Sequence, residues 1–283
     1  MHFPGQHQKP GRLATVLTMV VLAVWATKAF AIVNHDRASG LTPLQLEIEQ
    51  QRQRLSAVEE EERRDAVTQL GAMKHPDASR VAVAALKDIS PSVRATAASS
   101  ILALPGEESA ANLIPLLSDK NEFVRREVAY ALGVGRSKSA VGPLLERLLL
   151  DKEDGVRGAA AVALGDIADS SAIATLAAVM KSEVVATGLK KNSKSKKEQN
   201  PFVLRAAARA LGQIGSREAV PALIATLENE KTEDDVRREA ATSLGLIGDS
   251  SALPSLRNAL TARDPYLSKA VHEAIKAIEK QKG

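Results

Sequence analysis

The side chains that could do chemistry are few in this 283-residue chain, and they lie far apart in the sequence. There is no cysteine, which excludes thiolate metal sites, cysteine nucleophiles and disulfides. Beyond residue 31 only His35, His75 and His272 remain, and none belongs to a His-x-x-x-His or His-Glu-x-x-His pattern that would hold a metal. No glycine-rich phosphate loop and no Gly-x-Ser-x-Gly motif occurs. We therefore expect no catalytic residue, no metal site and no cofactor.

Arginine and aspartate, in contrast, recur at regular spacing. An apolar residue followed by arginine marks each repeat, and the arginines are separated by 31, 32, 48 and 32 residues. The pairs are Val93-Arg94, Val124-Arg125, Val156-Arg157, Leu204-Arg205 and Val236-Arg237. Asp88, Asp119 and Asp151 each precede an arginine by six residues, whereas Gln199 and Lys231 stand at that position before the last two. An alanine-rich stretch follows each arginine and ends in Leu-Gly in four of the five copies.

Two short helices per repeat are needed to position these residues. The first helix is expected to begin near the Val-Arg pair and to end near the glycine of Leu-Gly, since glycine tolerates a positive φ. The second helix is expected to begin at a Ser-Ala pair, with serine as its N-cap and a proline in its first turn. One helix pair cannot bury its apolar face alone, so neighbouring pairs must stack. Alanine allows this stacking to be close, which fits the low aromatic content of 2%.

These motifs resemble the HEAT-repeat family, in its short bacterial type known as the phycobilisome-lyase HEAT-like repeat. The resemblance runs from a weaker unit at residues 64–71 to an expected terminal helix at 264–280. It implies an all-α, right-handed α-solenoid of stacked antiparallel helix pairs over residues 62–283, with about six pairs and a terminal helix. His272-Glu273 resembles the iron-binding His-Glu pairs of HEAT-type deoxyhypusine hydroxylases. Those enzymes use several such pairs, and this chain has one.

The resemblance also implies roles for two sets of residues. The repeated arginines and aspartates are expected to form a hydrogen-bond ladder between units, made of Asp88, Arg94, Asp119, Arg125, Asp151 and Arg157. The second helices are expected to line the concave face of the solenoid. Candidate partner contacts on that face are Glu146, Arg147, Arg257 and Asn258.

The N-terminus has the pattern of a targeting segment. Lys9 and Arg12 precede an apolar run over residues 13–27, and an Ala-x-Ala site ends at Ala31. Residues 1–31 are thus expected to be a signal peptide, with Ile32 as the mature N-terminus. The alternative is an uncleaved membrane anchor over residues 13–33. Both interpretations place the rest of the chain outside the cytoplasm, either periplasmic or extracellular, or anchored in the inner membrane and facing outward.

Charge and aromatic content argue against nucleic-acid binding. The formal net charge is +4, but Lys9, Arg12 and Lys28 all precede Ile32, which leaves the rest of the chain near neutrality, at about +1. Four aromatic residues follow residue 31, namely Phe123, Tyr130, Phe202 and Tyr266. This is too few for a base-stacking platform, so we expect no nucleic-acid partner.

Two segments fall outside the repeats. Residues 32–61 are expected to form a tether and an N-terminal capping helix that starts at a capping box, Thr42-Pro43-Leu44-Gln45. A dimerisation or partner helix is the alternative. The second segment is a lysine-rich insertion near residues 181–200, which contains Lys190, Lys191, Lys194, Lys196 and Lys197. It is either a solvated loop or a contact for an acidic partner, anionic lipid or anionic polymer.

Together these features predict a non-catalytic scaffold for protein–protein interaction. In this interpretation an exported solenoid binds a protein partner in the cell envelope. One alternative is an accessory subunit of an enzyme, such as a lyase-like protein. The other is a membrane-tethered structural spacer that keeps residues 13–33.

Overall fold

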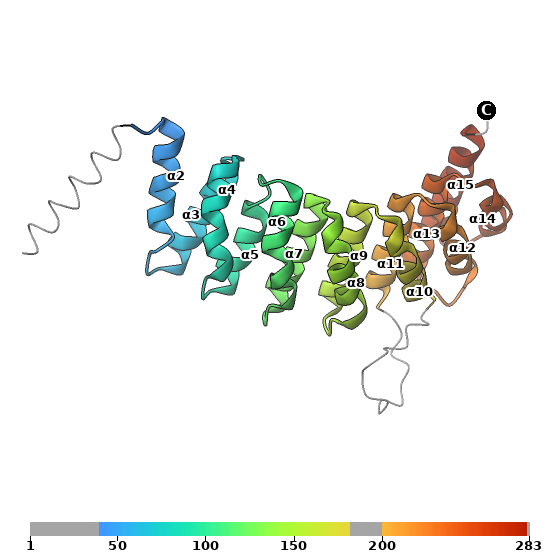
Figure 1. Ribbon diagram of the computed structural model, residues 1–283. Helices are drawn as coiled ribbons and strands as arrows, with labels where there is room; N and C mark the ends of the chain where they lie inside the picture. Colours follow the sequence, from blue (N-terminus) through green and yellow to red (C-terminus); the bar gives the residue numbers. More distant parts are fainter. Residues whose placement is uncertain (1–39, 182–199, 282–283) are drawn as a thin grey trace, which may run out of the picture. The chain divides into compact units, whose positions relative to one another are not determined.

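The computed structural model describes residues 40–181 and 200–281, and every regular element in these two ranges is helical (Figure 1). The chain forms two compact units, residues 1–50 and residues 51–283. The described part of the first unit, residues 40–50, contains the start of helix α2 (Pro43–Arg54). There the Thr42 N–H donates to Gln45 Oε1, and the Gln45 N–H donates to Thr42 Oγ1. This reciprocal pair is the predicted capping box.

The second unit is a stack of helix pairs closed by a single helix. Its described elements are α3 (Glu60–Ala72) with α4 (Pro76–Ala82), α5 (Pro91–Ser100) with α6 (Gly106–Leu113), α7 (Glu122–Gly135) with α8 (Val141–Leu150), α9 (Asp154–Ile167) with α10 (Ile173–Met180), α11 (Pro201–Ile214) with α12 (Val220–Glu228), α13 (Asp234–Ile247) with α14 (Leu253–Ala259), and finally α15 (Pro265–Lys280). The predicted all-α solenoid of stacked antiparallel helix pairs is therefore confirmed.

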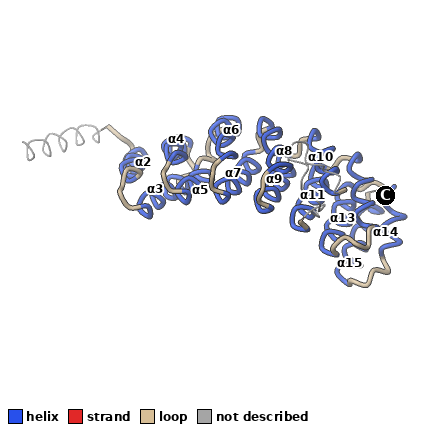
Figure 2. The backbone as a smooth tube through the Cα atoms, turned by 90° about the horizontal axis from the view of Figure 1, so that it is seen from below, coloured by secondary structure: helices blue, strands red, loops and turns tan. Residues whose placement is uncertain are grey.

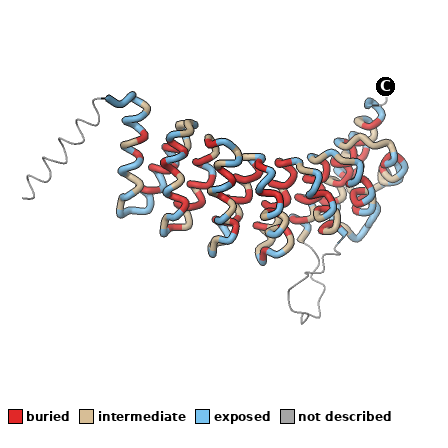
Figure 3. The backbone as a smooth tube through the Cα atoms, viewed as in Figure 1, coloured by how far each residue is buried: buried red, intermediate tan, exposed pale blue. Residues whose placement is uncertain are grey.

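The helices of this unit form two rows. The first row is made of the helices that carry the repeated arginine position, α3, α5, α7, α9, α11, α13 and α15, and each packs directly on the next. The second row contains α4, α6, α8, α10, α12 and α14, which make far fewer contacts with one another. Buried residues concentrate where the rows meet (Figure 3). They are aliphatic, as predicted, with Leu132, Leu144 and Leu164 among the fully buried side chains.

Glycine sets the close spacing of the first row. A Cβ atom at Gly133 would lie 2.7 Å from Ala163 Cα, and one at Gly245 would lie 2.8 Å from Ala274 Cα. Both distances are shorter than van der Waals contact, so a side chain at either position would push neighbouring helices apart. Because the first row is drawn together in this way, the stack bends toward it. Figure 2 shows α9, α11, α13 and α15 on the inner side of the bend and α8, α10 and α14 on the outer side.

The ends of the first helices differ from the prediction. We expected them to end at the glycine of Leu-Gly, yet Gly133 lies inside α7 and packs against α9. The helices run about one turn further, to left-handed residues at Arg136, Ala168, Gly215 and Gly248. Glycine is therefore required after leucine because it lets neighbouring helices approach closely, and not because the backbone needs a positive φ there.

The starts of the second helices also differ in detail. A short 3-10 turn leads into α10 and α14, and its cap is Asp169 or Asp249, which accepts the N–H two residues later. The serine of the Ser-Ala pair donates that N–H instead of serving as the cap. In the described residues, no helix is both long and apolar enough to cross a membrane. The predicted signal peptide or anchor lies outside the described residues.

Candidate functional site

The repeated arginines reach from one helix pair to the next. Arg94 donates from Nε and Nη2 to the two carboxylate oxygens of Asp119, at 2.8 and 2.9 Å. Arg125 binds Asp151 in the same bidentate way, also at 2.8 and 2.9 Å. The remaining Nη1 group of each arginine donates to main-chain carbonyls of the turn that precedes its own helix. Each arginine therefore joins two consecutive turns.

One residue of this ladder, Arg63, was not among the ladder residues predicted from the sequence. Arg63 donates from Nε and Nη2 to Asp88, at 2.7 and 3.0 Å. The spacing contains the signal, because Arg63 precedes Asp88 by 25 residues, as Arg94 precedes Asp119. The weaker first unit was recognised at residues 64–71, but Arg63 was not assigned to the ladder, because Glu62 stands where the later repeats have valine or leucine.

Burial and ion pairing shift the pKa values of the ladder carboxylates in opposite directions. Burial would raise the pKa of Asp151, but the hydrogen bonds from Arg125 and from the Glu153 N–H lower it, and the result is a pKa below its usual value. The same balance lowers the pKa of Asp119. At Asp88 the hydrogen bond from Arg63 is the largest influence and lowers the pKa. These carboxylates are held ionised and are fully used within the protein, so the ladder stabilises the fold and does not offer groups to a ligand.

Arg157 was predicted to belong to the ladder, but its ion pair lies within its own helix. Its guanidinium pairs with Asp154, three residues earlier in α9. Its Nε atom is buried without a hydrogen-bond partner among the described residues. The position about 25 residues further on, where the other ladder arginines find their aspartate, falls within residues 182–199, outside the described ranges.

The last two repeats use other acceptors. Arg205 donates to Asp235 at 3.1 Å, in an exposed pair. Arg237 donates to the Leu227 carbonyl oxygen and to Asp234. Neither arginine has an aspartate 25 or 26 residues further on, where the ladder arginines find theirs, since Glu230 and Lys231 stand there after Arg205 and Ala262 and Arg263 after Arg237.

The predicted partner contacts lie on the second row. Glu146 and Arg147 are on α8 and pair with each other. Arg257, on α14, pairs with Glu279 at 3.1 Å, and Asn258 beside it is exposed. The prediction that the second helices line the concave face is wrong, because the closely packed first row lies on the inner side of the bend (Figure 2). The predicted lysine contacts, Lys190, Lys191, Lys194, Lys196 and Lys197, lie outside the described residues.

The inner row carries exposed aromatic side chains, each beside an arginine. The Arg126 guanidinium lies 5.1 Å from the centre of the Phe123 ring, and the Arg205 guanidinium lies 6.0 Å from that of Phe202. In α15 the exposed Tyr266 ring is 5.6 Å from the guanidinium of Arg238 on α13. Cation–π contacts of this kind hold an arginine over a ring at the surface. The sequence signal was available, since arginine follows phenylalanine by three residues in both α7 and α11.

A hollow opens on the inner row between α11, α13 and α15. Its volume is about 380 Å³, and its lining residues are Arg205, Arg209, Asp235, Arg238, Glu239, Thr242 and Ala270. Arg209 binds Glu239 through two nitrogens, at 2.9 and 3.3 Å, and these bonds raise the pKa of Arg209. Arg238 lies 3.7 Å from Asp264. Each of the three arginines at this hollow therefore faces one carboxylate, Asp235, Glu239 or Asp264.

The described residues contain no cluster of three or more histidine, aspartate or glutamate side chains that could hold a metal ion. His75 caps α4 by accepting the Asp77 N–H, and His272 is exposed on α15. The inner row exposes apolar, aromatic and charged side chains.

Fold and ladder together define a solenoid of helix pairs joined by buried arginine–aspartate bridges. The family model for HEAT repeats matches residues 48–133, 110–187 and 194–276. The chain belongs to the HEAT-repeat family, as its sequence motifs predicted. No curated protein matches the sequence.

Several solved structures are similar to this chain. The complex of CpcE and CpcF of phycocyanin lyase from Nostoc sp. PCC7120 is 21% identical, over 82% of this chain and 94% of that one, with a TM-score of 0.49. Human deoxyhypusine hydroxylase is 21% identical over 82% of this chain and 84% of its own, with a TM-score of 0.41. A designed armadillo repeat protein in complex with the peptide (KR)4 is 20% identical over 82% and 99%, with a TM-score of 0.45.

Proposed function

We propose that this protein is a non-catalytic scaffold that binds a protein partner through the inner, first row of helices. The observation that carries this proposal is the distribution of exposed apolar side chains in the described residues. Phe123, Val134, Phe202, Leu246 and Tyr266 are exposed on helices of the first row, whereas Leu150 is the one such residue within the second-row helices. Exposed apolar side chains grouped on one surface are characteristic of interaction sites.

Helical spacing supports a shared surface. Phe123 and Val134 are eleven residues apart in α7, which is close to three full turns, so both lie on one side of the helix. Tyr130, seven residues after Phe123, belongs to the same side. Leu246 lies eleven residues after Asp235, which lines the hollow, so the two residues lie on one side of α13. The surface therefore extends along this helix. The surface thus spans several repeats, as expected for a solenoid that holds an extended partner.

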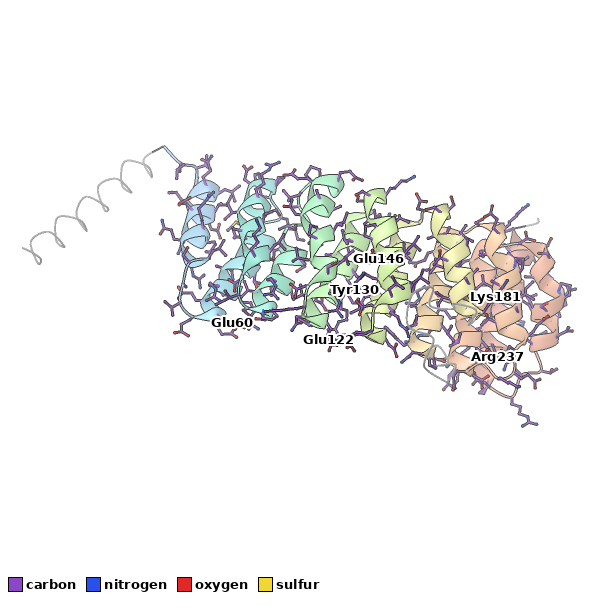
Figure 4. The ribbon with its side chains drawn as sticks, turned by 60° about the horizontal axis from the view of Figure 1, so that its bottom comes forward. Glu60, Glu122, Tyr130, Glu146, Lys181 and Arg237 are labelled. Atoms are coloured by element: carbon purple, nitrogen blue, oxygen red, sulfur yellow. The ribbon has the colours of Figure 1, made fainter. Side chains whose placement is uncertain are left out.

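Site-specific photo-crosslinking tests this proposal. Tyr130 on α7 and Glu146 on α8 belong to adjacent helices of different rows (Figure 4). A photoreactive phenylalanine derivative at Tyr130 should give a discrete protein adduct in the native host. The same group at Glu146 is the matched control and should give none. Adducts from Glu146 alone, or none from either position, would contradict binding through the first row.

We also propose that the protein acts outside the cytoplasm. The support is the basic start, apolar run and Ala-x-Ala site of residues 1–31, which lie outside the described residues. Sequencing the N-terminus of the protein from its host tests both forms of this proposal. A start at Ile32 would mean a cleaved signal peptide, and an intact N-terminus in the membrane fraction would mean an anchor. An intact N-terminus in the cytosolic fraction would contradict export.

A further inference from the structure

We propose that a strip of aromatic and arginine side chains on the inner row binds a proline-rich segment of the protein partner in the polyproline II conformation. This inference rests on the proposed scaffold function and adds the chemistry of the partner. The aromatic strip consists of three rings, each in contact with a guanidinium: Phe123 with Arg126, Phe202 with Arg205, and Tyr266 with Arg238.

The three rings occupy the same position in their repeats. Each is the second residue of a first-row helix, α7, α11 or α15, and stands directly before a fully buried residue. The N–H of each ring residue donates to the N-cap side chain of its helix. The three arginines likewise each follow a buried valine by two residues, namely Val124, Val203 and Val236.

Equivalent positions in stacked units lie in one line, so the rings and guanidinium groups form a single strip along the starts of the first-row helices. Figure 4 shows Glu122, next to Phe123, and Arg237, next to Arg238, along one edge of the stack. All three rings of the strip are exposed, and Tyr266 is the most exposed at 67%. The rings are therefore available to a chain that runs across the helices.

Low side chains separate the rings. On α9 the equivalent position is Gly155, where a Cβ atom would meet one atom, Arg126 Cδ, at 3.8 Å. On α13 the equivalent position is Asp235, whose carboxylate accepts a hydrogen bond from Arg205 at 3.1 Å. An extended chain can thus cross α9 and α13 while it contacts the rings on either side of them.

The charges of the strip are already balanced within the protein. Each arginine faces one carboxylate, and the pairs are Arg126–Glu127, Arg205–Asp235 and Arg238–Asp264. A strongly acidic or strongly basic segment would have to break these pairs without finding an unpaired charge in return. The strip therefore favours an uncharged occupant, and its affinity should come from contacts with the rings.

The strip has hydrogen-bond donors to spare. A guanidinium carries five N–H donors, and among the described residues Arg126 and Arg205 each donate through one nitrogen. Their side chains are exposed, at 41% and 44%. A proline-rich segment complements such a surface, because its backbone carbonyls are free in the polyproline II conformation and proline has no N–H that would need an acceptor. Aromatic surfaces are the usual docking sites of such segments.

The spacing of the helices matches this conformation. Helices packed side by side lie about 8–10 Å apart, and one turn of polyproline II, three residues of about 3.1 Å each, advances about 9 Å. Every third residue of the segment therefore meets the next helix with the same face. A β-strand alternates its face with a period of two residues, so it would turn opposite faces to successive helices. From α7 to α15 the strip crosses four helix spacings, which about twelve residues of polyproline II cover.

Fluorescence anisotropy with labelled peptides on the full-length protein tests the inference. The probe is a peptide of about twelve residues that repeats Pro-Pro-Leu, and its control repeats Ala-Ala-Leu at the same length. The proline peptide should bind more tightly, and its affinity should change little as salt is raised, since binding neutralises no net charge. Versions that repeat Pro-Pro-Glu or Pro-Pro-Lys should bind more weakly than the leucine version.

Removing rings should weaken the binding of the Pro-Pro-Leu peptide. Phe123→Ala/Tyr266→Ala should lower its affinity about tenfold, the combined effect of two lost ring contacts. Phe202 is left in place because its ring packs against Gly158. Leu150→Ala is the matched control, since Leu150 is also exposed, at 44% against 42% for Phe123, but lies on α8 in the second row. This control should bind like the wild type.

Equal affinity for the proline and alanine peptides would overturn the inference, as would a glutamate or lysine version that binds at least as tightly as the leucine version. An unchanged affinity in Phe123→Ala/Tyr266→Ala, with the circular dichroism spectrum of the wild type, or an equal loss in Leu150→Ala would do the same. The scaffold proposal is tested separately. Crosslinking at Tyr130 without binding of the proline peptide would leave the scaffold function standing and remove the proline-rich partner alone.

Discussion

The buried ladder makes a quantitative prediction at Arg125. Replacing Arg125 by methionine keeps most of the aliphatic stem and removes the guanidinium. The carboxylate of Asp151, 2% exposed, then loses both hydrogen bonds at 2.8 and 2.9 Å. It retains the N–H of Glu153 and a more distant guanidinium, Arg147 Nη1 at 3.9 Å. A largely buried charge is therefore left with incomplete compensation.

The expected loss follows from this geometry. Removing one partner of a buried ion pair costs about 3–5 kcal/mol. Because Glu153 and Arg147 remain near Asp151, we place the Arg125→Met substitution at the lower end, about 3 kcal/mol. The corresponding substitution of exposed Arg209 should cost at most about 1 kcal/mol. Replacing both partners, in Arg125→Met/Asp151→Leu, should recover part of the loss, since no buried charge is left unpaired.

Urea unfolding followed by far-UV circular dichroism measures these free energies, and hydrogen exchange shows where the loss occurs. In a solenoid each unit contacts its neighbours alone, so faster exchange should be concentrated in α7, α8 and α9. A cost of Arg125→Met no larger than that of Arg209→Met, or a double variant less stable than Arg125→Met, would refute this role of the buried pair.

Three further predictions concern pH, packing and capping. The hydrogen bond from Arg63 holds the pKa of Asp88 below its unfolded value, so this pair stabilises the protein above about pH 4 and loses its contribution as the pH falls through the lower folded pKa. In urea unfolding, the stability of Asp88→Asn should therefore depend less on pH in this acid range than that of the wild type. Equal pH dependence of the two proteins would contradict the assignment. A Cβ at Gly158 would collide with the Phe202 ring, so Gly158→Ala should lower the melting temperature and Phe202→Leu in the same chain should restore it at least in part; no rescue would mean that the ring is not the cause. Asp264 accepts the first N–H groups of α15, and Asp264→Ala should cost about 1 kcal/mol in chemical unfolding, with an unchanged value arguing against the cap.

Much of the fold could be predicted from the sequence because its determinants are local. The apolar spacing, the prolines of the second helices and the regular arginines lie within single units of about 30 residues. Each unit repeats the same physical problem, an apolar face that one helix pair cannot bury. The family model for HEAT repeats accordingly matches residues 48–187 and 194–276.

The candidate site was harder to predict because it depends on contacts between units. The sequence identified Asp119 and Arg125 as ladder residues. The spacing of these two residues does not reveal that the carboxylate bound by Arg125 belongs to Asp151 of the next unit. The aromatic–arginine pair of Arg238 and Tyr266 joins two helices that are separate in sequence. The sequence pattern of a single repeat unit does not predict such a pair.

The sequence by itself determined the repeat, the helix pairs, the aliphatic core and the scarcity of reactive groups, since each follows from short-range spacing and composition. The tertiary structure alone decided which row of helices lies inside the bend. That choice depends on how closely neighbouring helices approach, and the approach is set where Gly133 meets Ala163 and Gly245 meets Ala274. Because the small residues are on the first row, the helices of that row pack closely and lie on the inner side of the bend. The proposed binding surface is therefore on the first row, whereas the sequence had suggested the second helices.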